Sequence, residues 1–195
     1  LMHSPFASMP EFLQCVVKAF AAGAPRHHRL VFKAHPLESG RRALARDIAA
    51  LAAQYDIADR VDYVPGGKLA QLLDHARSAV TVNSTAGQQA LWRGLPLKAF
   101  GKAVYDKPQF VSSLPLDEFF AQPPYPDNAA YLDYRRYLLE TSQLPGGFYS
   151  TRGRRQLLRQ VIDMLLSDLD PFDAFEYGNS ASLSGRENTK SREVD

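Results

Sequence analysis

The sequence has little of several features that mark particular classes of protein. It has one cysteine, Cys15, among 195 residues, so an intrachain disulfide is impossible. The apolar neighbours of Cys15 predict a buried thiol in a reducing compartment. No apolar run approaches the roughly 20 residues of a membrane-spanning helix, and residues 1–12 lack the basic-then-apolar order of a signal peptide. We therefore expect a cytoplasmic protein.

Charge of one sign is also lacking, and so are several catalytic motifs. The 23 basic and 21 acidic residues give a formal net charge of +2, so we predict no nucleic-acid partner. No CxxC or HExxH motif occurs, and the side chains of the adjacent His27 and His28 should point in different directions. We predict no metal and no tightly bound cofactor. The absence of GxSxG and GxxxxGK[ST] argues against a serine hydrolase and a P-loop nucleotide site.

What the sequence does have is a regular alternation of helical and strand patterns. Apolar residues at helical spacing predict helices over residues 10–22, 41–55, 69–75, 85–94, 129–142 and 154–168. Short runs with β-branched residues predict strands over residues 29–34, 60–65, 78–82 and 96–101. This order predicts an α/β fold, a Rossmann-like parallel sheet flanked by helices on both faces.

The rest of the chain departs from this alternation. Residues 105–128 contain five prolines and predict an irregular crossing segment. We expect one domain over residues 1–168, with additional C-terminal helices, and a disordered tail over residues 177–195. A helix is expected almost at once, with no strand before it. The chain therefore reads as though it begins partway through a larger protein.

Candidate ligand-binding residues lie where three of the expected strands end. Because parallel sheets bind ligands at the carboxyl ends of their strands, these groups should converge at one edge. They are Lys33, His35 and Pro36 after the first strand, Asn83, Ser84, Thr85 and Gly87 after the third, and Gly101 and Tyr105 after the fourth.

The chemistry of these residues suits the phosphate of a nucleotide. Ser84 or Thr85 can cap the following helix and leave its first amides pointing outwards, and Gly87 has no side chain to obstruct close approach. His35 can donate a hydrogen bond to a phosphate. Taken singly, each element also has a structural explanation: a plain helix cap, a histidine at a strand end, or, for Lys33, an exposed strand residue.

Three features outside this edge are also open to two interpretations. The basic cluster in the last helix is typical of a solvated face, and contact with an acidic glycan or lipid is the alternative; it consists of Arg152, Arg154, Arg155 and Arg159. Trp92 fits the core better than a stacking platform. Asp106 and Glu118 fit ordinary surface acids better than catalytic carboxylates.

Three blocks in this order resemble the bacterial capsule polysaccharide biosynthesis family, whose better-understood members are Kdo transferases. The blocks are "SPFASMPEFLQCVVKAFAAGAPRHHRLVFKAHPLESG", "VTVNSTAGQQALWRGLPLKAFGKAVYD" and "TSQLPGGFY". The resemblance implies a GT-B glycosyltransferase of two Rossmann-like domains, whose C-terminal domain binds the donor CMP-Kdo without a tightly bound metal.

The resemblance also implies roles for particular residues. His35 is similar to the histidine that contacts the CMP phosphate in other CMP-sugar transferases, and the helix start at Ser84 and Thr85 would occupy the matching phosphate-binding place. Gln88, Gln89, Gly101 and Tyr105 are candidates for base or ribose contacts. Catalytic residues stay unassigned.

The sequence departs from the family where an N-terminal domain would bind the acceptor and supply catalytic carboxylates. We therefore expect the donor-binding part of a transferase, inactive without that domain. The implied partners are a nucleotide sugar, a lipid-linked glycan acceptor and other capsule assembly proteins, with peripheral attachment at the inner membrane left open. Two alternatives remain: half of a UDP-sugar transferase, and a non-enzymatic subunit for capsule assembly or export.

Overall fold

The computed structural model describes residues 4–35, 40–144, 150–168 and 170–176. Helices and strands alternate from the start. In order they are α1 (Met9–Gly23), β1 (Leu30–Lys33), α2 (Arg41–Gln54), a 3-10 turn η1 (Ala58–Arg60), β2 (Val61–Val64), α3 (Leu69–Leu73), β3 (Ala79–Thr81), α4 (Ala86–Trp92), β4 (Leu97–Ala99), α5 (Leu116–Ala121), α6 (Asn128–Thr141) and α7 (Thr151–Leu165). The predicted alternation of helices and strands is confirmed.

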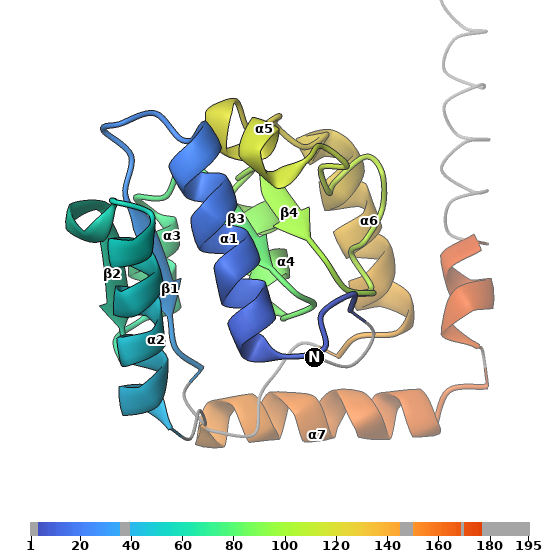
Figure 1. Cartoon of the computed structure of the whole chain (residues 1–195). Coiled ribbons are helices and arrows are strands. Elements are labelled where there is room, and N and C mark those ends of the chain that lie inside the picture. Colours follow the sequence, from blue (N-terminus) through green and yellow to red (C-terminus); the bar gives the residue numbers. More distant parts are fainter. Residues whose placement is uncertain (1–3, 36–39, 145–149, 169, 177–195) are drawn as a thin grey trace, which may run out of the picture. The chain divides into compact units, whose positions relative to one another are not determined.

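The strands form two short parallel pairs. Strand β1 pairs with β2, with Leu30 opposite Val61, and β3 pairs with β4, with Ala79 opposite Leu97. The prediction of a single sheet is corrected in this respect, because strands of three or four residues offer few positions for a continuous ladder. Figure 1 shows α1 and α2 in front of the strands and α3 and α4 behind them, so helices flank the strands on both faces.

The main hydrophobic core lies between α1 and α5. Val17 of α1 and Phe119 of α5 are completely buried, and the ring of Phe20 meets that of Phe120 edge to face at 5.3 Å. At the end of α1, a Cβ on Gly23 would lie 2.0 Å from the carbonyl oxygen of Asp117, so only glycine permits this close approach.

Helix α5 corrects the prediction of an irregular segment over residues 105–128. Pro115 takes the N-cap position, and Asp117 and Glu118 place acidic groups in the first turn, where they favour a helix. The prolines of this segment therefore start a helix as well as interrupting one, and its buried phenylalanines fix the helix on α1.

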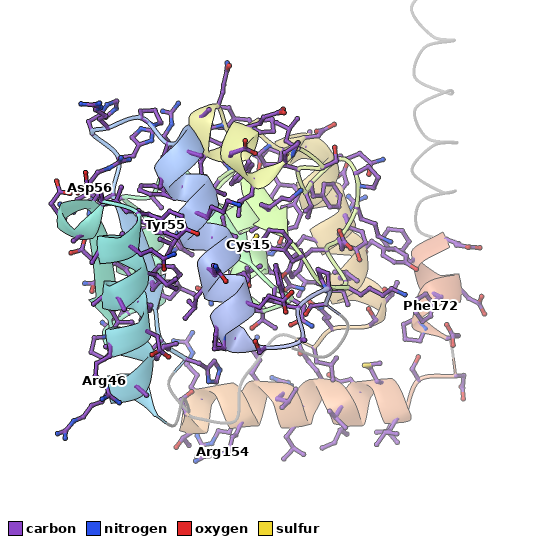
Figure 2. All side chains as sticks on the ribbon, in the orientation of Figure 1. Cys15, Arg46, Tyr55, Asp56, Arg154 and Phe172 are labelled. Atoms are coloured by element: carbon purple, nitrogen blue, oxygen red, sulfur yellow. The ribbon has the colours of Figure 1, made fainter. Side chains whose placement is uncertain are left out.

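Cys15 lies on α1, where Figure 2 labels it. Its side chain is half-buried and packs against the edge of the core. Burial raises the pKa of the thiol, and the nearby Glu11 carboxylate adds to this effect. A raised pKa keeps the group in the unreactive thiol form, which fits the structural role expected from its neighbours.

The chain divides into two compact units, residues 1–131 and residues 132–195. In the second unit, the ring of Tyr137 on α6 lies 5.2 Å from that of Phe175 and 6.2 Å from that of Phe172, both in a short helix over residues 171–176. The expected disordered tail, residues 177–195, lies outside the described residues. The expected domain over residues 1–168 stays a prediction.

Candidate functional site

An open hollow lies at the carboxyl ends of β3 and β4, beside the loop after β3, the first turn of α4 and the loop after β4. The hollow has a volume of about 480 Å³, and its lining consists of Asn83, Thr85, Gln88, Lys102, Ala103, Val104 and Tyr105. Of these seven residues, only Lys102 carries a charge. The described residues offer its ammonium no hydrogen-bond or ion-pair partner, so the hollow holds a cation without a counter-ion.

Tyr105 forms the base of this hollow and fixes the two loops together. Its side chain is 2% exposed, and its hydroxyl donates a hydrogen bond of 2.5 Å to the carbonyl of Ser84. Its ring lies where a side chain at position 87 would be, since a Cβ on Gly87 would come within 2.5 Å of the phenol. Position 87 therefore requires glycine, because any side chain there would overlap the ring of Tyr105.

The protonation state of Tyr105 supports this arrangement. Burial, with further contributions from Asp106 and Tyr131, raises the pKa of Tyr105 to about 12. The phenol therefore remains a neutral donor at ordinary pH. Tyr131, 3% exposed, makes a second contact of the same kind, because its hydroxyl donates a 3.1 Å hydrogen bond to the carbonyl of Gln88.

The start of α4 differs from the expected phosphate cap. Thr85 occupies the N-cap position but makes no side-chain capping bond. Instead, the hydroxyl of Ser84 accepts from the amide of Ala86 at 3.2 Å, and the carbonyl of Ser84 accepts from the amide of Gly87 at 2.9 Å. The amide of Gln88 donates to the carbonyl of Thr85 at 3.1 Å. The first amides of α4 are thus already used within the loop, contrary to expectation. A ligand in the hollow would meet side chains instead.

The structure places the remaining predicted residues in different surroundings. Lys33 ends β1 and donates to the carbonyl of Ala34 at 2.9 Å, while His35 is exposed just beyond. Neither residue lines the hollow. Gly101 is buried and its amide donates to the carbonyl of Val82 at 2.7 Å, which closes the end of β4. Gln89 lies on α4 outside the lining, and Pro36 lies outside the described residues.

Two lysines near this edge were not selected from the sequence. Lys102 follows Gly101 directly, so the strand-end rule that selected Gly101 could have selected it too. Lys98, within β4, donates to the carbonyls of Leu114 at 2.6 Å and Ser112 at 3.1 Å. Burial lowers the pKa of Lys98, and Asp106 opposes this shift. Lys98 therefore links β4 to the segment before α5, and Lys102 is the cation available to a ligand.

The described residues provide neither a metal-binding cluster nor a helix that could span a membrane. Residues 4–35, 40–144, 150–168 and 170–176 contain no cluster of three or more histidine, cysteine, aspartate or glutamate side chains that could hold a metal ion. In the same residues, no helix combines the length and the apolar character needed to cross a bilayer.

Comparison with known proteins gives a consistent result. The model of a family described as "Capsule polysaccharide biosynthesis protein" matches residues 1–149. The capsule polysaccharide modification protein LipB of Neisseria meningitidis serogroup A is 35% identical over 150 residues, which is 76% of this chain and 36% of LipB. The capsule polysaccharide export protein KpsS of Escherichia coli is 33% identical over 147 residues, which is 75% of this chain and 38% of KpsS.

These matches cover only part of each relative's sequence. The chain spans little more than a third of the length of the curated relatives that it matches. No solved structure matches the chain significantly.

Proposed function

Because the chain belongs to the capsule polysaccharide biosynthesis family, we propose that it is the donor-binding part of a glycosyltransferase that acts on capsule polysaccharide. The observation that carries this proposal is the hollow at the carboxyl ends of β3 and β4, which contains the ammonium of Lys102, unpaired among the residues that the structure describes. Nucleotides bind at this end of parallel strands in α/β proteins, and a phosphate is a fitting partner for an unpaired cation.

The proposed donor is CMP-Kdo, in a protein of the GT-B architecture. A CMP-sugar has a single phosphate, which one lysine and neighbouring polar groups can bind without a metal ion. In this proposal, the ammonium of Lys102 pairs with the phosphate, and the hydroxyl of Thr85 donates a hydrogen bond to the nucleotide. Asn83 and Gln88 make contacts with the base or the ribose. Lys33, the last residue of β1, and His35, two residues further on, are proposed to reach the ligand from the other strand pair.

The chemical role proposed for this part is stabilisation of the leaving group. When the bond between the sugar and CMP breaks, negative charge develops on the phosphate, and a cation held beside it lowers the barrier. The base or nucleophile would be a carboxylate supplied by a further domain, together with the site for a lipid-linked glycan acceptor. The proposed location is cytoplasmic, with peripheral attachment at the inner membrane and contact with other capsule proteins.

A second candidate is a non-enzymatic role in capsule assembly or export. It is favoured by the name of one relative, an export protein, which is 33% identical over 147 residues. In this case the fold is retained without a nucleotide, and the hollow with Lys102 has no ligand.

Calorimetric titration of the chain with CMP and with UDP distinguishes these possibilities. We expect CMP to bind more tightly than UDP, and Lys102→Ala to weaken binding about tenfold, since hydrogen bonds to charged groups contribute about 1.5–3 kcal/mol. Lys107→Ala, an exposed lysine in the same loop but outside the lining, is the matched control and should bind like the wild type.

Further outcomes would redirect the proposal. Weaker binding by His35→Ala would place β1 in the site, whereas weaker binding by Ser84→Ala would indicate an effect through the loop that it caps. A preference for UDP would favour a UDP-sugar donor. A well-folded chain that binds neither nucleotide would contradict the donor-binding proposal and favour the role in assembly or export.

A further inference from the structure

Helix α7 separates polar from apolar side chains more sharply than α1, α2 or α6. With about 100° between successive residues, the apolar residues occupy an arc that covers roughly half of the helix surface. The apolar residues of the helix are Leu157, Leu158, Val161, Ile162, Met164 and Leu165, and Leu166 follows at the C-cap. Helix α1 has such a face too, but there it is buried in the core.

The apolar arc of α7 is largely uncovered. None of its residues is buried, and the exposed fractions are 61% for Leu158, 79% for Leu165 and 78% for Leu166. Isolated apolar residues on a surface are ordinary, but a continuous arc of them on one helix marks an interaction surface. The helix also has a defined start, because the hydroxyl of Ser150 accepts from the amide of Gly153 at 3.0 Å.

The charges on α7 indicate what kind of partner fits this arc. Four arginines lie in the first nine residues of the helix, whereas Asp163 is its single acidic residue. With the same spacing, Arg155 and Arg159 fall along one border of the apolar arc, whereas Arg154, near the amino end of the helix, falls within it. This excess of positive charge is local, because the whole chain carries a net charge of only +2. A second copy of α7 would bring two rows of arginines together, whereas an anionic lipid surface would pair with them.

We propose that α7 binds the surface of a bilayer that contains anionic phospholipid. The helix lies in the plane of the membrane, with Leu158, Ile162 and Leu165 among the acyl chains and the arginines at the phosphates. An apolar face combined with a polar face rich in arginine is the pattern of such interfacial helices. This surface would make the membrane attachment proposed above, and it is distinct from the nucleotide site because no residue of α7 lines the hollow.

Vesicle co-sedimentation of the full chain tests the proposal. We expect binding to vesicles of phosphatidylglycerol and phosphatidylcholine, weak binding to phosphatidylcholine alone, and loss of binding in 1 M salt. Each arginine near an anionic surface contributes roughly a fivefold gain in affinity. Arg155→Gln combined with Arg159→Gln should therefore weaken binding about 25-fold. The matched control, Arg42→Gln with Arg46→Gln on the exposed side of α2, should leave it unchanged.

A second variant tests whether the apolar residues of α7 contribute to lipid binding. Leu158→Glu with Leu165→Glu should abolish binding at every lipid composition while CMP titration and circular dichroism remain as in the wild type. Absence of binding to anionic vesicles, or equal binding by the arginine variant and its control, would overturn the proposal. A dimer in light scattering that the leucine variant dissociates, without lipid binding by the wild type, would assign the arc to a second copy instead.

Discussion

A cation lies at one end of each strand pair, and the two cations have different surroundings: Arg60 is bonded to backbone carbonyls, whereas Lys102 lines an open hollow. At the amino ends of β1 and β2, the guanidinium of Arg60 donates to the carbonyls of Pro25 at 2.8 Å, His28 at 3.1 Å and Ala24 at 3.3 Å, and it lies 4.8 Å from the ring centroid of Phe20. That cation therefore closes a loop through three backbone carbonyls.

At the carboxyl ends of β3 and β4, the neutral phenol of Tyr105 closes the loop, and the ammonium of Lys102 stays accessible to a ligand. Tyr105 makes the buried contact, while Lys102 lines the hollow. A structural cation such as Arg60 is bonded to protein acceptors, whereas a cation that could bind a ligand, such as Lys102, has an open space beside it. Four substitutions test whether the two edges differ in this way.

Gly87→Ala should have the largest effect on stability. The added methyl group would come within 2.5 Å of the Tyr105 phenol and push the ring out of its site. We expect the free energy of unfolding to fall by about 3 kcal/mol, as in other overpacked sites. Denaturant unfolding measures it. Gly66→Ala is the matched control, because nothing lies within 4 Å of its added Cβ. Equal effects at both glycines would mean that the Tyr105 ring does not require the space at residue 87.

Arg60→Gln should have the next largest effect. It removes the charged donor from three carbonyls and the contact with Phe20, and we expect a loss of about 2 kcal/mol. Arg46→Gln, on the exposed surface of α2, should change the free energy of unfolding by less than about 0.5 kcal/mol. If the two arginines proved equivalent in chemical unfolding, the amino edge would not be closed by Arg60.

Tyr105→Phe should cost about 1 kcal/mol, the usual net contribution of one neutral hydrogen bond. The wild type should also lose stability at high pH. The folded-state pKa of about 12 exceeds the unfolded value of 10, so the contribution of Tyr105 is complete below pH 10 and declines between pH 10 and pH 12. In unfolding curves measured across this range, the decline should be smaller for Tyr105→Phe. An unchanged decline would assign it to other groups.

Lys102→Ala should have the smallest effect on stability, within about 0.5 kcal/mol, because its side chain is exposed and has no partner within the described part of the chain. Thermal unfolding without nucleotide checks this expectation. A loss as large as that of Arg60→Gln would remove the contrast between the two edges and make Lys102 a structural residue.

Most of the fold could be predicted because it depends on local patterns. Among the described residues, the apolar periodicities predict every strand and all helices except α5, the 3-10 turn η1 and the short helix over residues 171–176. Helix α5 is not predicted because the five prolines over residues 105–128 favour an irregular segment, although Pro115 can begin a helix whose phenylalanines pack against α1. The split into two strand pairs depends on hydrogen bonding across the sheet, which no local pattern encodes.

The candidate site was predictable only in its location. The strand-end rule selects Asn83, Thr85 and Tyr105, and the family resemblance adds Gln88; all four line one hollow, and their role in binding stays a prediction. It could not show that the amides at the start of α4 are used by Ser84, because that depends on the loop conformation. Nor could it show that Gly87 accommodates the ring of a residue 18 positions later in the chain.

The pairing of each strand with the next strand in the sequence has a consequence for how the chain folds. Leu30 meets Val61, and Ala79 meets Leu97, so neither pairing waits for a distant part of the chain. Short loops close at low entropic cost, and folding rates rise as contacts become more local. We expect the two strand–helix–strand segments to form early and separately. Docking of α5 onto α1, between residues about a hundred positions apart, would then complete the core and set the overall rate.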